Sequence, residues 1–305
     1  MTVSAPTRQL KQDDAKLNQR IRQRLKLNRI LKYVLLGCTL VGLLVLAVLI
    51  IDTLVKGTSH LNLHFLTSFS SSTPSMAGIK GALVGTLWLM ITIIPISIIL
   101  GVGTAIYLEE YARDNTFTRI IKISISNLAG VPSVVFGLLG LTIFVRGMGI
   151  EALGLGNSII AAALTMSLLI LPIIIVASQE AIRAVPQSMR DASYGLGATQ
   201  WQTIRRVVLP AALPGILTGF ILALSRALGE TAPLILIGIP TVLLSLPSSI
   251  FDQFQALPMQ IYNWAKLPQA EFQNVASAGI IVLLIILLLM NAIAIFLRNK
   301  FSKKF

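Results

Sequence analysis

The segment EAIRAVPQSMRDASYGLGATQWQTIRRVVLPAALPG, residues 180–215, is a polar and basic stretch set between two long apolar runs. Pro186 is typical of a helix start, and Gly197 is typical of a helix end. Thr199 followed by Gln202 matches a capping box, in which two side chains satisfy free amide groups at the start of a helix. The segment therefore predicts two short helices joined by a glycine turn.

We call residues 180–210 the 180–210 hairpin. Its second half carries apolar residues at helical spacing, opposite the basic pair Arg205 and Arg206: Trp201, Ile204, Val207 and Val208. An amphipathic hairpin of this kind fits two interpretations. It lies on a membrane surface, or it is a rigid projection that contacts a partner protein.

The composition places most of the chain in a lipid bilayer. Of its 305 residues, 55% are hydrophobic and 12% are charged, against about 25% charged in a soluble domain. The net charge of +13 comes from short basic segments between uncharged runs, so it indicates membrane topology and not a nucleic-acid partner. Cys38 is the single cysteine, which excludes a disulfide or a cysteine metal cluster within the chain.

Uncharged runs of about 20 residues or more predict an all-α, polytopic membrane protein with six transmembrane helices. The chain then divides into a basic N-terminal segment (1–32), a transmembrane domain with the hairpin (33–297) and a basic tail (298–305). The predicted spans are approximately 33–55, 81–107, 123–145, 156–178, 211–238 and 275–297.

The basic residues predict the orientation of these spans. With six spans, twenty of the 25 Lys and Arg residues lie in segments on one side, four lie on the other, and Arg226 remains within a span. Both termini and the hairpin are therefore expected in the cytoplasm. The same count favours one helix over two for residues 211–238.

The first apolar run exceeds the length of a signal-peptide core, which predicts an uncleaved anchor.

The stretch RALGETAP, residues 226–233, places charges inside the fifth predicted span. Arg226 and Glu230 are four residues apart and so share one helix face. A charge at this depth costs at least a few kcal/mol, so such residues usually face a bundle interior or a water-filled path. The alternative is a structural ion pair between helices. Pro233 predicts a bend beside the charges.

Other constellations are weaker. His60 and His64 are four residues apart, but no third ligand is in view, and we predict no metal site. Glu109 and Glu110 end the second span, where they either contact arginines of the hairpin or cap the interface. No G-x-x-x-x-G-K-[ST] sequence and no hydrolytic arrangement occurs, which predicts a transport subunit and not an enzyme.

Energy must then come from another chain or from an ion gradient. Three functions remain open at this point. They are the pore subunit of an ATP-driven importer, a proton-coupled transporter that uses Glu230, and a structural or assembly protein in which the Arg226–Glu230 pair joins helices. Proton-coupled transporters usually show inverted repeats, and the sequence shows none.

The order Asp191-Ala192-Ser193, three residues, Gly197, nine residues, Val207-x-Leu209-Pro210 resembles the EAA motif of ATP-binding-cassette importer permeases. The spacing matches throughout, with Asp for Glu, Ser for Ala and Val for Ile. This resemblance implies the type I importer permease fold and a hairpin that docks on a cytoplasmic ATPase. The residues implied in coupling are Asp191, Ala192, Ser193, Gly197, Ala198, Thr199, Trp201, Leu209 and Pro210.

A narrower resemblance extends across most of the chain. YLEEYA (107–112), NLAGVPSVVFGLLGL (127–141), residues 196–219 and RALGETAPLIL (226–236) resemble the PstA family of phosphate-importer permeases. The family implies a bacterial inner-membrane location and a heterodimer with the sister permease PstC. It also implies two copies of the ATPase PstB, which use ATP and Mg, and the external phosphate-binding protein PstS. No cofactor bound by this chain is implied.

This resemblance gives the charged stretch a chemical meaning. Phosphate needs compensating positive charge inside a low-dielectric bundle, and the Arg226 guanidinium matches a tetrahedral oxyanion. We expect Arg226, Glu230 and Thr231 on the substrate pathway, for phosphate or alternatively another oxyanion. Glu230 either holds Arg226 until phosphate displaces it, or accepts a hydrogen bond from an anion that still carries a proton.

Overall fold

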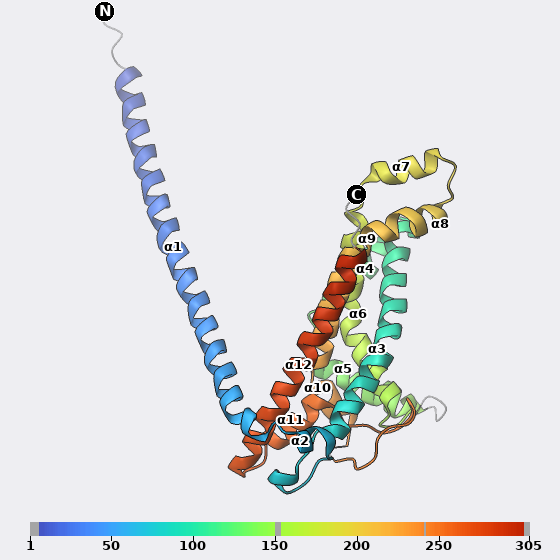
Figure 1. Cartoon of the computed structure of the whole chain (residues 1–305). Helices are drawn as coiled ribbons and strands as arrows, with labels where there is room; N and C mark the ends of the chain where they lie inside the picture. The colour runs from blue at the N-terminus through green and yellow to red at the C-terminus, as the bar shows by residue number, and fades with distance from the viewer. Residues whose placement is uncertain (1–5, 150–153, 241, 302–305) are drawn as a thin grey trace, which may run out of the picture. The chain divides into compact units, whose positions relative to one another are not determined.

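A computed structural model describes residues 6–149, 154–240 and 242–301, and all regular structure in these ranges is helical, as predicted. The long helices are α1 (Pro6–Gly57), α3 (Lys80–Ile106), α6 (Ile159–Arg183), α9 (Leu209–Gly229) and α12 (Ala270–Phe301) (Figure 1). The shorter ones are α2 (Leu63–Thr67), α4 (Thr116–Leu128), α5 (Ser133–Gly140), α7 (Gln187–Gly195), α8 (Gln200–Thr203), α10 (Ala232–Ile237) and α11 (Leu257–Ala265). Tight 3-10 turns occupy Thr58–His60, Pro74–Met76 and Gly147–Gly149, and π-helical turns occupy Tyr107–Tyr111, Leu141–Val145 and Ile204–Val208.

The chain forms two compact units, Met1–Val55 and Lys56–Phe305. In the first unit, α1 is one uninterrupted helix, so no helix end marks the boundary predicted at residues 32 and 33. Its side chains are exposed from residue 24 to residue 52, and most of those after residue 32 are apolar. A helix that is apolar on all sides fits contact with lipid or with another membrane helix.

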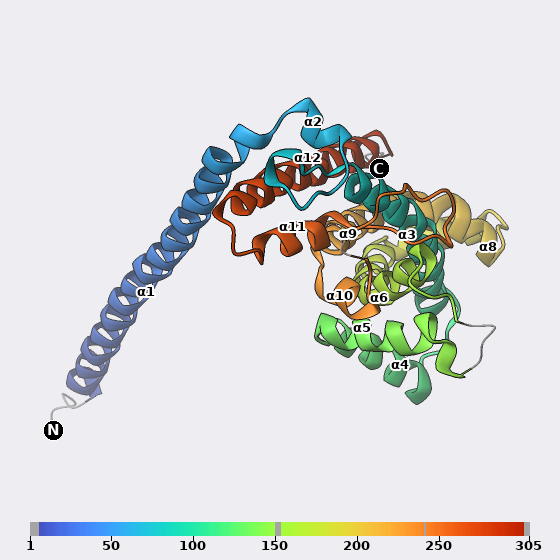
Figure 2. The ribbon, with the colours of Figure 1, turned by 90° about the horizontal axis from the view of Figure 1, so that it is seen from below.

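The core of the second unit lies between α3, α6 and α9, with α12 packed against α9 (Figures 1 and 2). Ile93, Met166 and Ala223, one from each of the three central helices, are fully buried there. α6 is in contact with both α3 and α9 over most of its length. Its small residues, Ala161, Ala162 and Ala163, are also fully buried, which places α6 at the centre of the bundle.

A close approach of α6 and α9 depends on two glycines spaced four residues apart. A Cβ atom added at Gly215 would lie 2.6 Å from the Cβ of Ala181, and one added at Gly219 would lie 2.2 Å from the Cβ of Ala177. Small residues at this spacing let membrane helices pack with their backbones close together. The α6–α9 contact therefore has no room for a side chain at either glycine.

We expect Gly219→Ala to destabilise the protein by about 1–3 kcal/mol, because the two helices must separate to admit the methyl group. Thermal unfolding of the purified chain in detergent, followed by tryptophan fluorescence, measures this loss. Gly103→Ala is the matched control, since a Cβ atom at Gly103 meets nothing within 4 Å. Equal melting temperatures for the two variants would contradict the close contact.

Two of the predicted spans are not continuous helices, and the prediction was wrong there. The span expected at 123–145 is divided into α4 and α5, which meet at an angle of 105°. Pro132, at the N-cap of α5, has extended backbone angles (φ −56°, ψ 138°), and proline disfavours helix in the residue before it. The helix expected at 211–238 ends at Gly229, because Pro233 has no N–H to bond the Gly229 carbonyl, and α10 starts at Ala232.

By length and apolar composition, five helices of the described residues are able to cross a membrane, or six if the bent α4–α5 pair counts as one span. α7 and α8 lie at one end of the second unit, which we call the hairpin end, and α2 and α11 lie at the other (Figure 1). At the α2–α11 end, the rings of Phe65 and Trp264 pack at 5.9 Å in a second apolar cluster. The second unit thus has two separate ends joined by an apolar bundle.

Candidate functional site: the hairpin and the charged helix break

The 180–210 hairpin has the local structure that its sequence predicts. Pro186 is the N-cap of α7, and Gly197 has a positive φ of 82°, the left-handed conformation that glycine adopts without strain. The capping box is present, with the Thr199 side chain accepting from Gln202 N–H and the Gln202 side chain accepting from Thr199 N–H. The Ser193 and Thr203 hydroxyls, 2.9 Å apart, connect the two arms.

The tip of the hairpin exposes large apolar side chains. Leu196 is 90% exposed and Trp201 is 53% exposed, while Ile204 and Val208 further along are buried. Trp201 therefore lies outside the buried face that Ile204 and Val208 form. Asp191, Ala192, Gly197 and Thr199 are also exposed, whereas Ser193, Ala198, Leu209 and Pro210 are half-buried. An exposed apolar tip on a rigid turn is typical of a protein-binding surface.

The base of the hairpin is joined to the bundle by ion pairs at the π-helical turn Tyr107–Tyr111. Oε1 of Glu109 accepts hydrogen bonds from Lys122 Nζ, Gln179 Nε2 and Arg183 Nη2, each at 3.0 Å. These donors come from α4 and α6, so Glu109 connects three helices. Of the two roles left open for this residue, contact with an arginine is the one observed.

Glu110, the next residue, faces the hairpin itself. Its Oε1 accepts from Arg190 Nη2 at 3.1 Å, and both side chains are largely buried, at 9% and 12% exposed. Arg190 also donates to the carbonyls of Ile182 and Val185, and Gln200 Nε2 donates to the Glu110 carbonyl. Both α7 and the start of α8 are thereby fixed to the end of α3.

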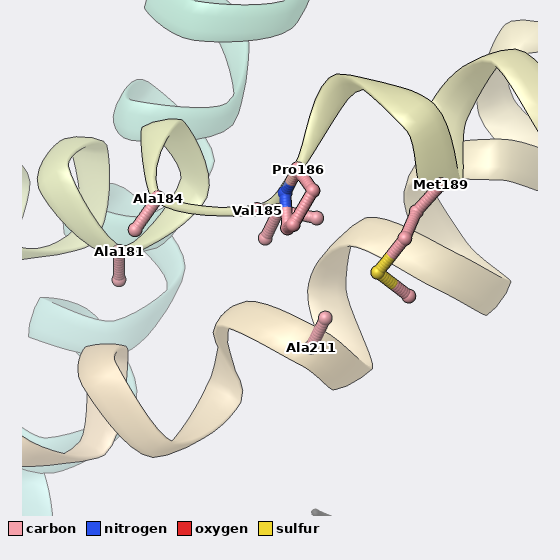
Figure 3. Close-up of a pocket in the computed structure, with 6 residues that line it drawn as sticks. All are labelled: Ala181, Ala184, Val185, Pro186, Met189 and Ala211. Atoms are coloured by element: carbon pink, nitrogen blue, oxygen red, sulfur yellow. The ribbon is translucent and has the colours of Figure 1, made fainter. Parts of the chain in front are cut away.

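An apolar cavity of about 550 Å³ lies beside the hairpin base. Figure 3 shows Met189 of α7 extending toward Ala211 of α9, with Val185 and Pro186 to the left of Met189. The rest of the lining is the small side chains of Ala181 and Ala184. These side chains are short, and the Glu110–Arg190 ion pair is one of the polar contacts that connect α7 to the rest of the chain.

The second part of the site is the charged pair at the break between α9 and α10. Arg226 Nε lies 3.4 Å from Glu230 Oε1, so the two residues share a face as their spacing predicts. Glu230 is the first residue beyond α9, with extended backbone angles (φ −80°, ψ 122°), and Thr231 precedes α10. Within the described residues, Nε is the one atom of the guanidinium with a hydrogen bond, and the side chain is 41% exposed. Both Nη atoms of Arg226 thus remain available to an oxyanion.

Polar contacts hold this break on both sides. Ser225 Oγ donates to Asn291 Oδ1 of α12 at 2.8 Å, and Asn157 Nδ2 donates to the Gly238 carbonyl at 2.7 Å. No pattern in the sequence predicted a role for these residues, or for Lys122, Gln179 and Gln200. The available signal was the presence of Asn291 and Gln179 within otherwise apolar runs, where a polar side chain usually has a partner.

Comparison with known proteins agrees with this architecture. Residues 93–305 match the family described as binding-protein-dependent transport system inner membrane component. The probable ABC transporter permease protein YqgI of Bacillus subtilis is 34% identical over 82% of this chain and 88% of its own. The phosphate transport system permease protein PstA of Yersinia pestis is 33% identical over 91% of this chain and 90% of its own.

Among solved structures, a bacterial ABC transporter involved in alginate import superposes with a TM-score of 0.65 and 17% identity, over 93% of this chain and 100% of that chain. The MetNI methionine ABC transporter superposes with a TM-score of 0.56 and 15% identity, over 74% of this chain and 96% of that chain. These two establish the fold alone. The chain therefore belongs to the binding-protein-dependent inner membrane component family, the non-catalytic permease subunits of ABC importers, and has PstA permeases among its homologues.

Proposed function

We propose that this chain is the membrane-spanning permease subunit of an ATP-driven importer of inorganic phosphate. The observation that carries the proposal is the Arg226 guanidinium, fixed at a helix break by Glu230 with both Nη atoms available. A planar donor group that stays protonated matches the oxygens of phosphate. The 33% sequence identity with the PstA permease of Yersinia pestis, over 91% of this chain, supports phosphate as the substrate.

In this proposal the hairpin and both termini lie in the cytoplasm of a bacterium, and the distribution of the basic segments supports this orientation. The chain pairs with a PstC-type sister permease to form the pathway. Two PstB-type ATPases hydrolyse ATP and contact the hairpin, and a PstS-type binding protein delivers phosphate from outside. The exposed Leu196 and Trp201 are the side chains that enter the ATPase surface.

We expect Leu196→Asp and Trp201→Asp each to weaken binding of the ATPase by about 30-fold or more. A buried apolar or aromatic anchor at an interface contributes about 2 kcal/mol, and a carboxylate in its place adds a desolvation cost. Surface plasmon resonance, with the ATPase titrated over the immobilised membrane complex, measures this change in affinity.

Leu63→Asp is the matched control, because Leu63 is 76% exposed at the opposite, α2–α11 end. It should leave ATPase binding unchanged. If the hairpin variants and the Leu63 variant bind the ATPase equally well, the hairpin is not the docking surface and coupling must occur elsewhere.

A further inference from the structure

The short helix α10 follows the charged break directly, and contacts near both of its ends fix it to the rest of the chain. Two residues, Glu230 and Thr231, connect Gly229, the end of α9, to Ala232, the start of α10. A movement of α10 is therefore passed at once to Glu230, whose carboxylate holds the Arg226 guanidinium. The contacts that fix α10 thus decide where this ion pair lies.

The first contact is made by α5, which packs along α10. The two helices lie side by side in both views (Figures 1 and 2). A Cβ atom added at the buried Gly137 of α5 would lie 2.8 Å from the Pro233 Cα atom and 2.8 Å from the Leu236 Cδ1 atom. The leucine side chain is able to rotate away, but the Pro233 Cα atom belongs to the backbone. A methyl group at Gly137 therefore has to displace α10 itself.

The second contact is made by Asn157 at the other end of α10. Its Nδ2 donates to the Gly238 carbonyl at 2.7 Å, where α10 ends in a left-handed residue with a φ of 78°. Asn157 directly precedes Ser158, whose side chain caps the central helix α6. An aspartate has nearly the same shape as an asparagine, but its carboxylate only accepts hydrogen bonds. Asn157→Asp therefore removes this connection without creating a cavity.

We propose that Gly137 and Asn157 are positioning residues, which place α10 so that Glu230 orients Arg226 toward the transported anion. This assignment rests on the proposed function. When either contact is lost, α10 shifts, the Glu230 carboxylate moves with it, and the guanidinium is no longer held at Nε. A donor that must be ordered during binding contributes less than one that is already held in place.

The first arm of the test measures phosphate transported per ATP hydrolysed, in proteoliposomes that hold the complete importer. A loss of folded complex lowers uptake and hydrolysis together and leaves this ratio unchanged. We expect Gly137→Ala and Asn157→Asp each to lower the ratio about 10-fold, the effect of one lost hydrogen bond to a charged group. In a Glu230→Gln background, Gly137→Ala should have no further effect, because it acts through Glu230. Gly130→Ala is the matched control, since a Cβ atom there meets only the Asn127 carbonyl oxygen within 4 Å, at 3.5 Å.

The second arm follows the position of α10 without reference to phosphate. Cys38→Ser removes the single cysteine of the chain, and Thr231→Cys then places one thiol at the break. The rate at which N-ethylmaleimide modifies this thiol depends on access to it. We expect Gly137→Ala and Asn157→Asp to raise the rate about 5-fold or more by opening the break, and Gly130→Ala to leave it unchanged.

The two arms separate failure of this assignment from failure of the proposed function. Modification rates that match the control in both variants would overturn the assignment, even in an importer that transports phosphate. An unchanged ratio of phosphate to ATP, or additive effects of Gly137→Ala and Glu230→Gln, would also overturn it. A wild-type complex that takes up no phosphate would instead overturn the proposed function, and the modification rates would still show whether Gly137 and Asn157 position α10.

Discussion

Arg226→Gln is expected to lower phosphate uptake by about 100-fold or more while basal ATP hydrolysis continues. Hydrogen bonds from a charged donor contribute about 1.5–3 kcal/mol each, and both Nη atoms are able to donate to phosphate oxygens. The loss of two such bonds, about 3 kcal/mol or more, corresponds to about 100-fold. Uptake of radiolabelled phosphate into proteoliposomes that hold the complete importer measures the change, after assembly of the variant complex is confirmed.

Arg298→Gln is the matched control, since Arg298 is an arginine on α12 that contacts Asn299 and Thr218 near the hairpin end. It should transport normally. Normal uptake by Arg226→Gln would show that the pair with Glu230 is only structural. Loss of uptake with ATP hydrolysis retained would place Arg226 on the path of the anion.

Glu230→Gln separates the two roles considered for the carboxylate. If Glu230 holds Arg226 until phosphate arrives, the transport rate changes. If Glu230 accepts a hydrogen bond from an anion that still carries a proton, the variant's preference for phosphate over sulfate falls. Competition of sulfate with phosphate uptake distinguishes the two. An unchanged rate and an unchanged preference would exclude both roles.

Breaking the Glu110–Arg190 pair is expected to uncouple ATP hydrolysis from transport. Removing one partner leaves a charge in a largely buried site, which destabilises by about 3 kcal/mol or more. We expect Glu110→Gln to release α7 from the end of α3, to lower the unfolding temperature and to reduce uptake at least 10-fold. ATP hydrolysis should persist, because the exposed tip of the hairpin is intact.

The double variant Glu110→Gln with Arg190→Met tests whether the pair acts as a unit. Replacing both charges with neutral side chains should cost less than the sum of the single changes. Arg205→Gln is the control, since Arg205 is an exposed arginine of the same hairpin without an ion pair among the described residues. Additive single effects in the double variant would show that the ion pair does not hold the hairpin.

The sequence was sufficient where structure depends on near neighbours. The capping box at Thr199 and Gln202, the N-cap at Pro186 and the turn at Gly197 each involve residues a few positions apart, and the structure has all of them. The all-helical fold also followed from the apolar runs. The spacing of Arg226 and Glu230 correctly predicted their contact.

The breaks within two apolar runs were not predicted as helix ends. Hydropathy averages the composition of a run, whereas the backbone responds to single residues such as Pro132 and Pro233. Contacts between distant segments, such as Glu110 with Arg190 or Ser225 with Asn291, depend on the packing of whole helices. The sequence left the role of Glu110 open for this reason.

We propose that this chain carries inorganic phosphate across a membrane by means of a partner's ATP hydrolysis. The most direct test is phosphate uptake by the reconstituted wild-type complex with its binding protein, with ATP or a non-hydrolysable analogue, and with or without a proton ionophore. We predict uptake that requires ATP, is unaffected by the ionophore and is not inhibited by a tenfold excess of sulfate. Uptake that proceeds without ATP and stops with the ionophore would show that a proton gradient, and not ATP hydrolysis, drives transport.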